Sequence, residues 1–183
     1  MKYLSAAITC ILSVTLLGAD VSVADVFDDK PIGLRIHYPG GWYIDRNVEA
    51  FRITSYPEQE ALPQVIAPAD GAVIVLTAPP DRPPPNNIKT VGDWMRFDRA
   101  SAATGRKVSE AEIKTERLGL IHVSVSRLDP TANLDATQII YYFEAGGRLL
   151  KASLYYRGHN RSEYFEGAVE AVIKNLEPEV SGR

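Results

Sequence analysis

The clearest pattern of apolar positions lies near the C-terminal end of the chain. Apolar residues recur there at intervals of three and four, which aligns them along one side of an α-helix. Asn160 and Glu163, just before this series, have the spacing of a capping box, and Pro178 follows its end. The pattern predicts an amphipathic helix with a buried stripe of Phe165, Ala168, Val169, Val172, Ile173 and Leu176.

Between residues 107 and 156 the apolar period is two, which is typical of half-buried strands. A strand from Lys107 to Arg117, a turn near Gly119 and a strand from Leu120 to Leu128 form the first predicted hairpin. A second hairpin joins 137–144 to 148–156 through Ala145-Gly146-Gly147, whose glycines permit the positive φ of a tight turn. Its strands carry neighbouring aromatic residues, so both faces of this hairpin are expected to be aromatic.

The segment between residues 34 and 104 is also predicted to combine strands with one helix. Thr90 and Asp93 have capping-box spacing at the start of a helix predicted from Val91 to about Thr104. Three strands are predicted before it, at Leu34–Tyr38, Phe51–Tyr56 and Ala72–Ala78. Because short turns join most of the strands, the sequence predicts an α+β fold in which an antiparallel sheet is sandwiched by helices in an α/β/α arrangement.

The first 24 residues have the features of a signal peptide. Lys2 precedes an apolar run from Ala6 to Ala19, and Ser22-Val23-Ala24 supplies small residues for cleavage. We therefore expect Asp25 to begin a single domain, residues 25–183, that is soluble and either periplasmic or secreted, with no membrane span after signal removal. Cys10, the one cysteine of the chain, lies in this signal, so the mature domain is expected to fold without disulfides.

Composition and motifs narrow the classes of function. The net charge is -3 with acidic and basic residues well mixed, which argues against nucleic acid as a partner. His37, His122 and His159 lack metal-ligand spacing, and the common hydrolase and nucleotide-binding motifs are missing from the sequence. We expect no catalytic residue, no metal and no cofactor. The acidic start at Asp25, Asp28 and Asp29 is interpreted as a solvated, frayed terminus.

Several segments resemble the PsbP-like fold family, which is named for an extrinsic protein of photosystem II. The segment from His37 to Trp42 is similar to the opening strand and turn of that family, and Trp42 is expected to close one end of the core. The strand 71–75, the hairpin 141–148 and the last helix follow in the matching order. The resemblance implies an antiparallel sheet between helical layers and a binding or assembly role.

Two regions are the candidate contact surfaces. The proline-rich segment from Pro79 to Asn87 is predicted to be an exposed loop, and Pro80 and Pro83 fit the spacing of polyproline ligands. Tyr142 and Tyr155 lie on the aromatic hairpin and are the second candidate, with packing under helices as the other interpretation. The predicted function is an exported, non-catalytic binding or assembly module that acts on another envelope protein. The alternative is a carrier of a small apolar or aromatic ligand between sheet and helix. Oligomeric state stays open.

Overall fold

The computed structural model of this chain describes residues 21–45, 51–57, 67–79, 88–100, 113–128, 136–158 and 160–178. Most of the predicted signal peptide, residues 1–20, lies outside the described residues. The described elements, in chain order, are β1 (Val23–Asp29), β2 (Leu34–Pro39), β3 (Tyr43–Asp45), β4 (Phe51–Thr54), β5 (Ala72–Thr77), α1 (Val91–Ala100), β6 (Ile113–Leu118), β7 (Ile121–Leu128), β8 (Thr137–Ala145), β9 (Arg148–Tyr156), α2 (Ser162–Lys174) and β10 (Glu177–Pro178).

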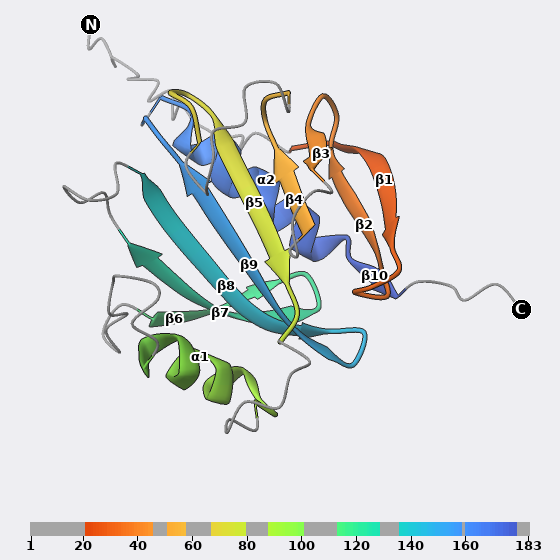
Figure 1. Cartoon of the computed structure of the whole chain (residues 1–183), viewed down its shortest axis with the longest axis vertical. Coiled ribbons are helices and arrows are strands. Elements are labelled where there is room, and N and C mark those ends of the chain that lie inside the picture. The colour runs from red at the N-terminus through yellow and green to blue at the C-terminus, as the bar shows by residue number, and fades with distance from the viewer. Residues whose placement is uncertain are drawn as a thin grey trace, which may run out of the picture.

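Seven strands form one antiparallel sheet in the order β3-β4-β5-β9-β8-β7-β6 (Figure 1). Its centre is the hairpin of β8 and β9, which pairs without interruption from Ala145 and Arg148 to Thr137 and Tyr156. Gly146 and Gly147 in the turn have φ values of 58° and 74°, as the sequence predicted. β5 pairs with the other side of β9, which brings the first half of the chain beside the C-terminal hairpin. The predicted antiparallel α+β fold is confirmed.

One face of this sheet, called the α2 face below, packs against α2. The predicted apolar stripe of the helix is confirmed, because Phe165, Ala168, Val169, Val172 and Ile173 are all buried. A smaller sheet with the order β1-β2-β10, which the sequence analysis did not predict, packs on the same core. Leu34 and Ile36 of β2 are 1% and 0% exposed, and Phe27 of β1 stacks on Phe51 of β4 with ring centroids 5.2 Å apart.

Trp42 lies where the turn after β2 meets α2. Its indole ring is 6% exposed and meets Phe165 edge-on, with ring centroids 6.2 Å apart. Its Nε1 donates a hydrogen bond of 3.1 Å to the hydroxyl of Tyr164, so the polar atom of the ring has a partner where it is buried. The prediction that Trp42 closes one end of the core is confirmed.

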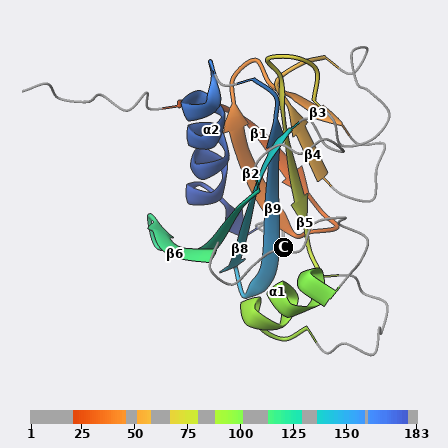
Figure 2. The same ribbon diagram turned by 90° about the vertical axis from the view of Figure 1, so that its left-hand side faces the viewer.

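The opposite face, called the α1 face below, carries α1 at one end of the sheet (Figure 2). Tyr141 belongs to the core under α2, whereas its neighbour Tyr142 packs with Trp94 of α1. Successive side chains of a strand point to opposite faces, so β8 supplies aromatic rings to both layers. The predicted sandwich of a sheet between helices, with aromatic residues on both faces, is confirmed.

The interpretation of the acidic start as a frayed terminus is wrong. Residues 25–29 belong to β1 and pair in register with β2, from Asp25 opposite Tyr38 to Asp29 opposite Leu34. Asp29 is 8% exposed, and its carboxylate accepts a hydrogen bond of 2.9 Å from the backbone N–H of Ile32. Backbone pairing with β2 and the hydrogen bond from Ile32 to Asp29 hold this segment in place, although its acidic sequence is typical of a solvated terminus.

Two predicted helix starts have different outcomes. The capping box at Thr90 is confirmed, because the Thr90 hydroxyl accepts from the Asp93 N–H while the Asp93 carboxylate accepts from the Thr90 N–H. The capping box at Asn160 and Glu163 is wrong. α2 has Arg161 at its N-cap position without a side-chain capping hydrogen bond.

Two boundaries fall partly outside the described residues. α1 ends its described course at Ala100, so the predicted helical residues up to 104 are not tested. The strand predicted from residue 107 is described only from Ile113. Among the described residues, no helix is long and apolar enough to span a membrane.

Candidate functional site

Among the described strands, β6 has the longest run of exposed residues. This strand stands last in the strand order, and β7 is its one described neighbour. The four residues from Lys114 to Arg117 are all exposed, so neither helical layer covers them. Figure 2 shows β6 at the outer margin of the molecule, beyond the centre of the sheet. An edge strand of this kind presents a row of backbone N–H and C=O groups to solvent.

A tight turn fixes the position of β6 on β7. Leu118 pairs with Ile121, so Gly119 and Leu120 alone form the loop. Gly119 has a φ of 61°, and glycine at the first central position is typical of a type II′ hairpin turn. Leu118 is 5% exposed and anchors one end of the strand in the core, whereas Leu120 at the tip is 89% exposed. The turn therefore holds β6 in a defined register although most of its side chains face water.

The side chains of β6 alternate between the two faces of the sheet. Lys114 and Glu116 lie opposite Val125 and Val123, which places them on the α2 face. Thr115 and Arg117 lie on the α1 face, because successive residues of a strand alternate. Arg117 turns back toward the hairpin, where its Nε donates a hydrogen bond of 2.9 Å to the carbonyl of Gly119. A partner strand would thus meet one basic and one acidic side chain together on the α2 face.

Tyr142, one of the predicted contact residues, is 2% exposed and lies beneath α1. Its hydroxyl donates a hydrogen bond of 2.9 Å to Oδ2 of Asp98, and its ring meets Trp94 edge-on, with centroids 6.5 Å apart. Lys151 Nζ lies 2.8 Å from the same carboxylate oxygen and 5.2 Å from the centre of the Trp94 ring. Asp98 therefore joins α1 to both strands of the central hairpin.

Tyr155, the second predicted tyrosine, is half-buried and lies on the same face of the sheet. On β9 it stands four residues beyond Lys151, which pairs with Tyr142. Its hydroxyl accepts a hydrogen bond of 2.8 Å from Nε2 of Gln138. The structure thus places the two tyrosines on one face and gives each a separate polar partner. Pro80 and Pro83 lie outside the described residues. A contact role for these four residues stays a prediction.

Polar groups on the α2 face hold the N-terminal half of α2 to the sheet. Glu166 Oε1 accepts a hydrogen bond of 2.8 Å from the Tyr156 hydroxyl, and Arg127 lies 3.0 Å from the same oxygen. Burial, followed by the hydrogen bond to Glu166, raises the pKa of Tyr156 above its ordinary value. Burial also raises the pKa of Tyr141, with the charge of Glu170 as the next cause. Both phenols are therefore neutral in the folded protein at neutral pH.

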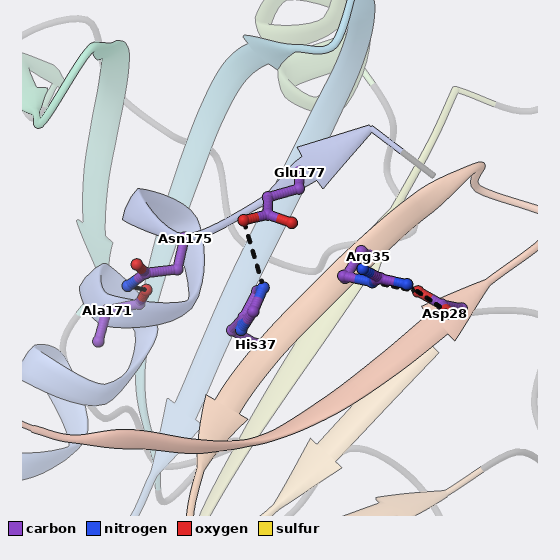
Figure 3. A network of polar contacts seen from close by, with 6 residues as sticks. All are labelled: Asp28, Arg35, His37, Ala171, Asn175 and Glu177. Carbon is purple, nitrogen blue, oxygen red and sulfur yellow. Dashed lines mark hydrogen bonds and ion pairs between the residues drawn. The ribbon is translucent and has the colours of Figure 1, made fainter. Parts of the chain in front are cut away.

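The structure describes two of the three histidines that were considered as metal ligands in the sequence analysis. His37 Nε2 is buried and lies 3.6 Å from Oε1 of Glu177 (Figure 3). His122 is exposed. His159 lies outside the described residues. Within the described ranges, no cluster of three or more histidine, cysteine, aspartate or glutamate side chains could hold a metal ion.

Figure 3 also shows polar contacts at the C-terminal end of α2 and between β1 and β2 of the small sheet. Asn175 Nδ2 donates a hydrogen bond of 2.8 Å to the carbonyl of Ala171 at the end of α2, just before β10 begins. On β2, Arg35 Nε lies 2.7 Å from Oδ1 of Asp28, and this hydrogen bond holds the pKa of Asp28 below its ordinary value. These contacts support the fold rather than a reactive centre.

No protein-family model matches the chain, and no curated protein matches it either. Solved structures do. The solution structure of CyanoP, the cyanobacterial PsbP of Synechocystis sp. PCC 6803, matches 84% of this chain and 91% of its own length, with a TM-score of 0.50 and 12% sequence identity. The chain has the PsbP-like fold. At this identity the likeness extends to the fold alone.

A crystal structure from Bacteroides thetaiotaomicron at 1.50 Å resolution matches this chain with a TM-score of 0.55 and 12% identity. The match covers 88% of the chain but 51% of that structure, so the chain spans about half its length.

The sequence analysis missed β6 as a candidate surface. It predicted a strand there but did not consider that strand as an edge. The signal was present, because Lys114, Thr115, Glu116 and Arg117 are four consecutive polar residues. A strand that is polar on both faces cannot be covered by two layers, so it belongs at the margin of a sheet.

Proposed function

We propose that this protein is an exported, non-catalytic assembly module that binds another envelope protein by accepting an extended segment along β6. The observation that carries the proposal is the exposed edge of β6 at the end of the seven-stranded sheet. Strand addition gains affinity from backbone hydrogen bonds and specificity from the side chains that alternate along the added strand. An assembly role therefore needs no cavity, metal or cofactor.

The charges on β6 make the edge selective. Natural sheets place charged residues on edge strands because an unmatched charge discourages pairing with an arbitrary strand. Lys114 and Glu116 share one face, so an incoming segment must place an acidic residue opposite the lysine and a basic residue opposite the glutamate. The edge thereby discriminates among extended segments by charge as well as by shape.

Export rests on the signal sequence and agrees with the pairing of β1. The predicted cut after Ala24 removes Val23 and Ala24 from this strand. The register of β1 on β2 shifts between Val23 and Asp25, and the pairs from Asp25 to Asp29 are continuous. Cleavage at this point would leave the regular part of the strand intact. The mass of the protein recovered from the envelope tests this, since a chain that starts at Asp25 is expected.

A ligand carrier is the second candidate, and one observation favours it. Ser126 is fully buried, and its Oγ has no hydrogen-bond partner among the described residues. It lies on the α1 face, two residues before Leu128, which packs with Trp94 and Ile140. A buried hydroxyl without a partner is costly, and a bound molecule with an acceptor group would relieve that cost. Native mass spectrometry of the purified protein would reveal such a molecule as an added mass.

Photo-crosslinking in the native envelope tests the assembly function. A photoreactive residue at Thr115 or Arg117 is expected to capture the same envelope protein from both positions. Tyr43 on β3 and Val26 on β1 are 46% and 52% exposed and serve as control positions. Lys114→Glu is expected to lower capture from β6 at least fivefold, because it leaves two acidic residues on one face. Equal capture from all four positions, or none from β6, would contradict the proposal.

A further inference from the structure

We infer that a second copy of this chain pairs with β6 in an antiparallel twofold dimer centred on Thr115. The inference rests on the proposed function in one respect, because both use the free edge of β6. It goes further by naming what occupies that edge before a segment of an envelope protein displaces it. A second copy is available wherever the protein is present, and its own β6 carries the same row of backbone groups, with which no described strand except β7 pairs.

Symmetry limits the ways in which two β6 strands can pair. A twofold axis perpendicular to the sheet continues the sheet and keeps the α2 faces of both copies on the same side. The axis then lies midway between the two copies of one residue. A residue that stands n positions before this residue in one copy lies opposite the residue n positions after it in the other copy. Opposed residues consequently share a face, as antiparallel pairing requires. The exposed run from Lys114 to Arg117 is short, so few positions are available.

Charge selects one position among them. With the axis at Thr115, each Lys114 lies opposite Glu116 of the second copy, and the two threonines face each other. Opposite charges and threonine pairs are both favourable when they lie directly across neighbouring strands. With the axis at Lys114 two lysines face each other, and with the axis at Glu116 two glutamates do. Like charges directly opposite are unfavourable, so the Thr115 position is preferred.

The same position matches the α1 face. There Ile113, which is half-buried, lies opposite Arg117 of the second copy. The aliphatic stem of an arginine can cover apolar surface while its guanidinium stays in water. Read from N to C, the segment that fits β6 is basic, then any residue, then acidic. Lys114-Thr115-Glu116 has this order itself, which makes β6 complementary to its own copy.

Charge exchange tests the pairing with the full exported chain. Lys114→Glu and Glu116→Lys are each expected to weaken self-association at least fivefold in sedimentation or light-scattering measurements. The double exchange, which restores opposite charges across the axis, is expected to return the dimer to within twofold of the original. An equimolar mixture of the two single variants should form heterodimers, because every pair across the axis is then of opposite sign. A double exchange that stays monomeric would overturn the inference.

A crosslink locates the axis. Thr115→Cys in a Cys10→Ser chain places one thiol per copy beside its symmetry mate, at a Cα separation of roughly 4.5 to 5.5 Å that suits a disulfide. Diamide is expected to convert this variant to a covalent dimer. Lys114→Cys in the same chain is the matched control, since its thiols lie on a diagonal roughly 7 to 8 Å apart and should crosslink poorly. Equal crosslinking of both variants would overturn the Thr115 register.

The two proposals can fail separately. A chain that is monomeric at high micromolar concentration, but still crosslinks to an envelope protein from Thr115, would refute the dimer and leave the assembly function standing. A chain that dimerises as described, but captures no envelope protein from β6, would refute the assembly function and leave the dimer. Circular dichroism of each variant separates loss of pairing from loss of folding.

Discussion

The two faces of the seven-stranded sheet are buried in different ways. On the α2 face, α2 and the small sheet together cover a continuous apolar core, and charged side chains such as Glu166 and Arg127 lie only at its margin. On the α1 face, a helix of ten residues covers one end, and a buried carboxylate, Asp98, joins it to the strands. The comparison shows that most of the apolar burial lies on the α2 face, whereas the α1 face has a smaller apolar cluster and a buried charged side chain.

The largest effect is expected from Trp42→Ala on the α2 face. The substitution removes a ring that is 6% exposed, together with its contacts to Tyr164 and Phe165. Truncation of a buried aromatic side chain typically costs about 3 to 5 kcal/mol. Urea unfolding would measure the loss. Tyr43→Ala is the control, since this neighbouring ring is 46% exposed and its loss should change stability by about 0.5 kcal/mol or less. Similar losses in both variants would show that Trp42 does not close the core.

A smaller effect is expected from Asp98→Ala on the α1 face. The substitution leaves the Lys151 ammonium and the Tyr142 hydroxyl without their shared acceptor. Removing one partner of a fully buried ion pair costs about 3 to 5 kcal/mol, but the Lys151 side chain is 21% exposed and can reach water, so a loss of about 1 to 3 kcal/mol is expected.

Hydrogen exchange tests whether the two faces of the sheet are stabilised independently. Amides of α1 should exchange faster in the Asp98→Ala variant while those of α2 keep their protection, because the two helices rest on separate clusters. Asp98→Asn keeps an acceptor for Tyr142 and removes the charge, so it separates the hydrogen bond from the ion pair. Uniform loss of protection across both helices would contradict the independence of the two faces.

The buried phenols of the α2 face predict a loss of stability at alkaline pH. Burial raises the pKa of Tyr141 in the folded protein, whereas the same phenol in the unfolded chain ionises near pH 10. The unfolded state therefore binds fewer protons above that pH, and stability falls as pH rises, by about 1 kcal/mol between pH 10 and 11 for this group. Tyr141→Phe should reduce this fall in denaturant titrations at pH 9 to 11. Tyr43→Phe, at an exposed position, should not.

The parts of the fold that follow from local patterns could be predicted from the sequence. The stripe of α2, the glycine turn of the β8–β9 hairpin and the cap at Thr90 each depend on residues a few positions apart. β1 could not be found this way, because its residues 24–26 are exposed and its pairing with β2 supplies the order. β10 has two residues, and one of them is Pro178. In the sequence, a proline at this position indicates the end of a helix rather than a strand.

The candidate surface depends on information that no local pattern contains. The sequence predicts a strand at β6, but its place at the edge follows from the strand order of the whole sheet. β5 pairs with β9 from a distant part of the chain, and this leaves β3 and β6 at the two margins. β3 has three residues and its ring at Tyr43 is exposed, whereas β6 has six residues in register. Length and charge pattern together distinguish the two edges once the order is known.

The smallest effect is expected from Thr90→Ala, which removes the cap of α1. The Thr90 hydroxyl accepts the N–H of Asp93 at 3.1 Å, and loss of such a cap costs about 0.5 to 2 kcal/mol in most helices. We expect a value of about 0.5 to 1 kcal/mol, because the Asp93 carboxylate still accepts from the N–H groups of residues 89 and 90. Thr90→Ser keeps the hydroxyl and should restore most of the loss in urea unfolding. If the serine variant lost as much as the alanine variant, the methyl group and not the cap would account for the effect, and the stability of α1 would not depend on this hydroxyl.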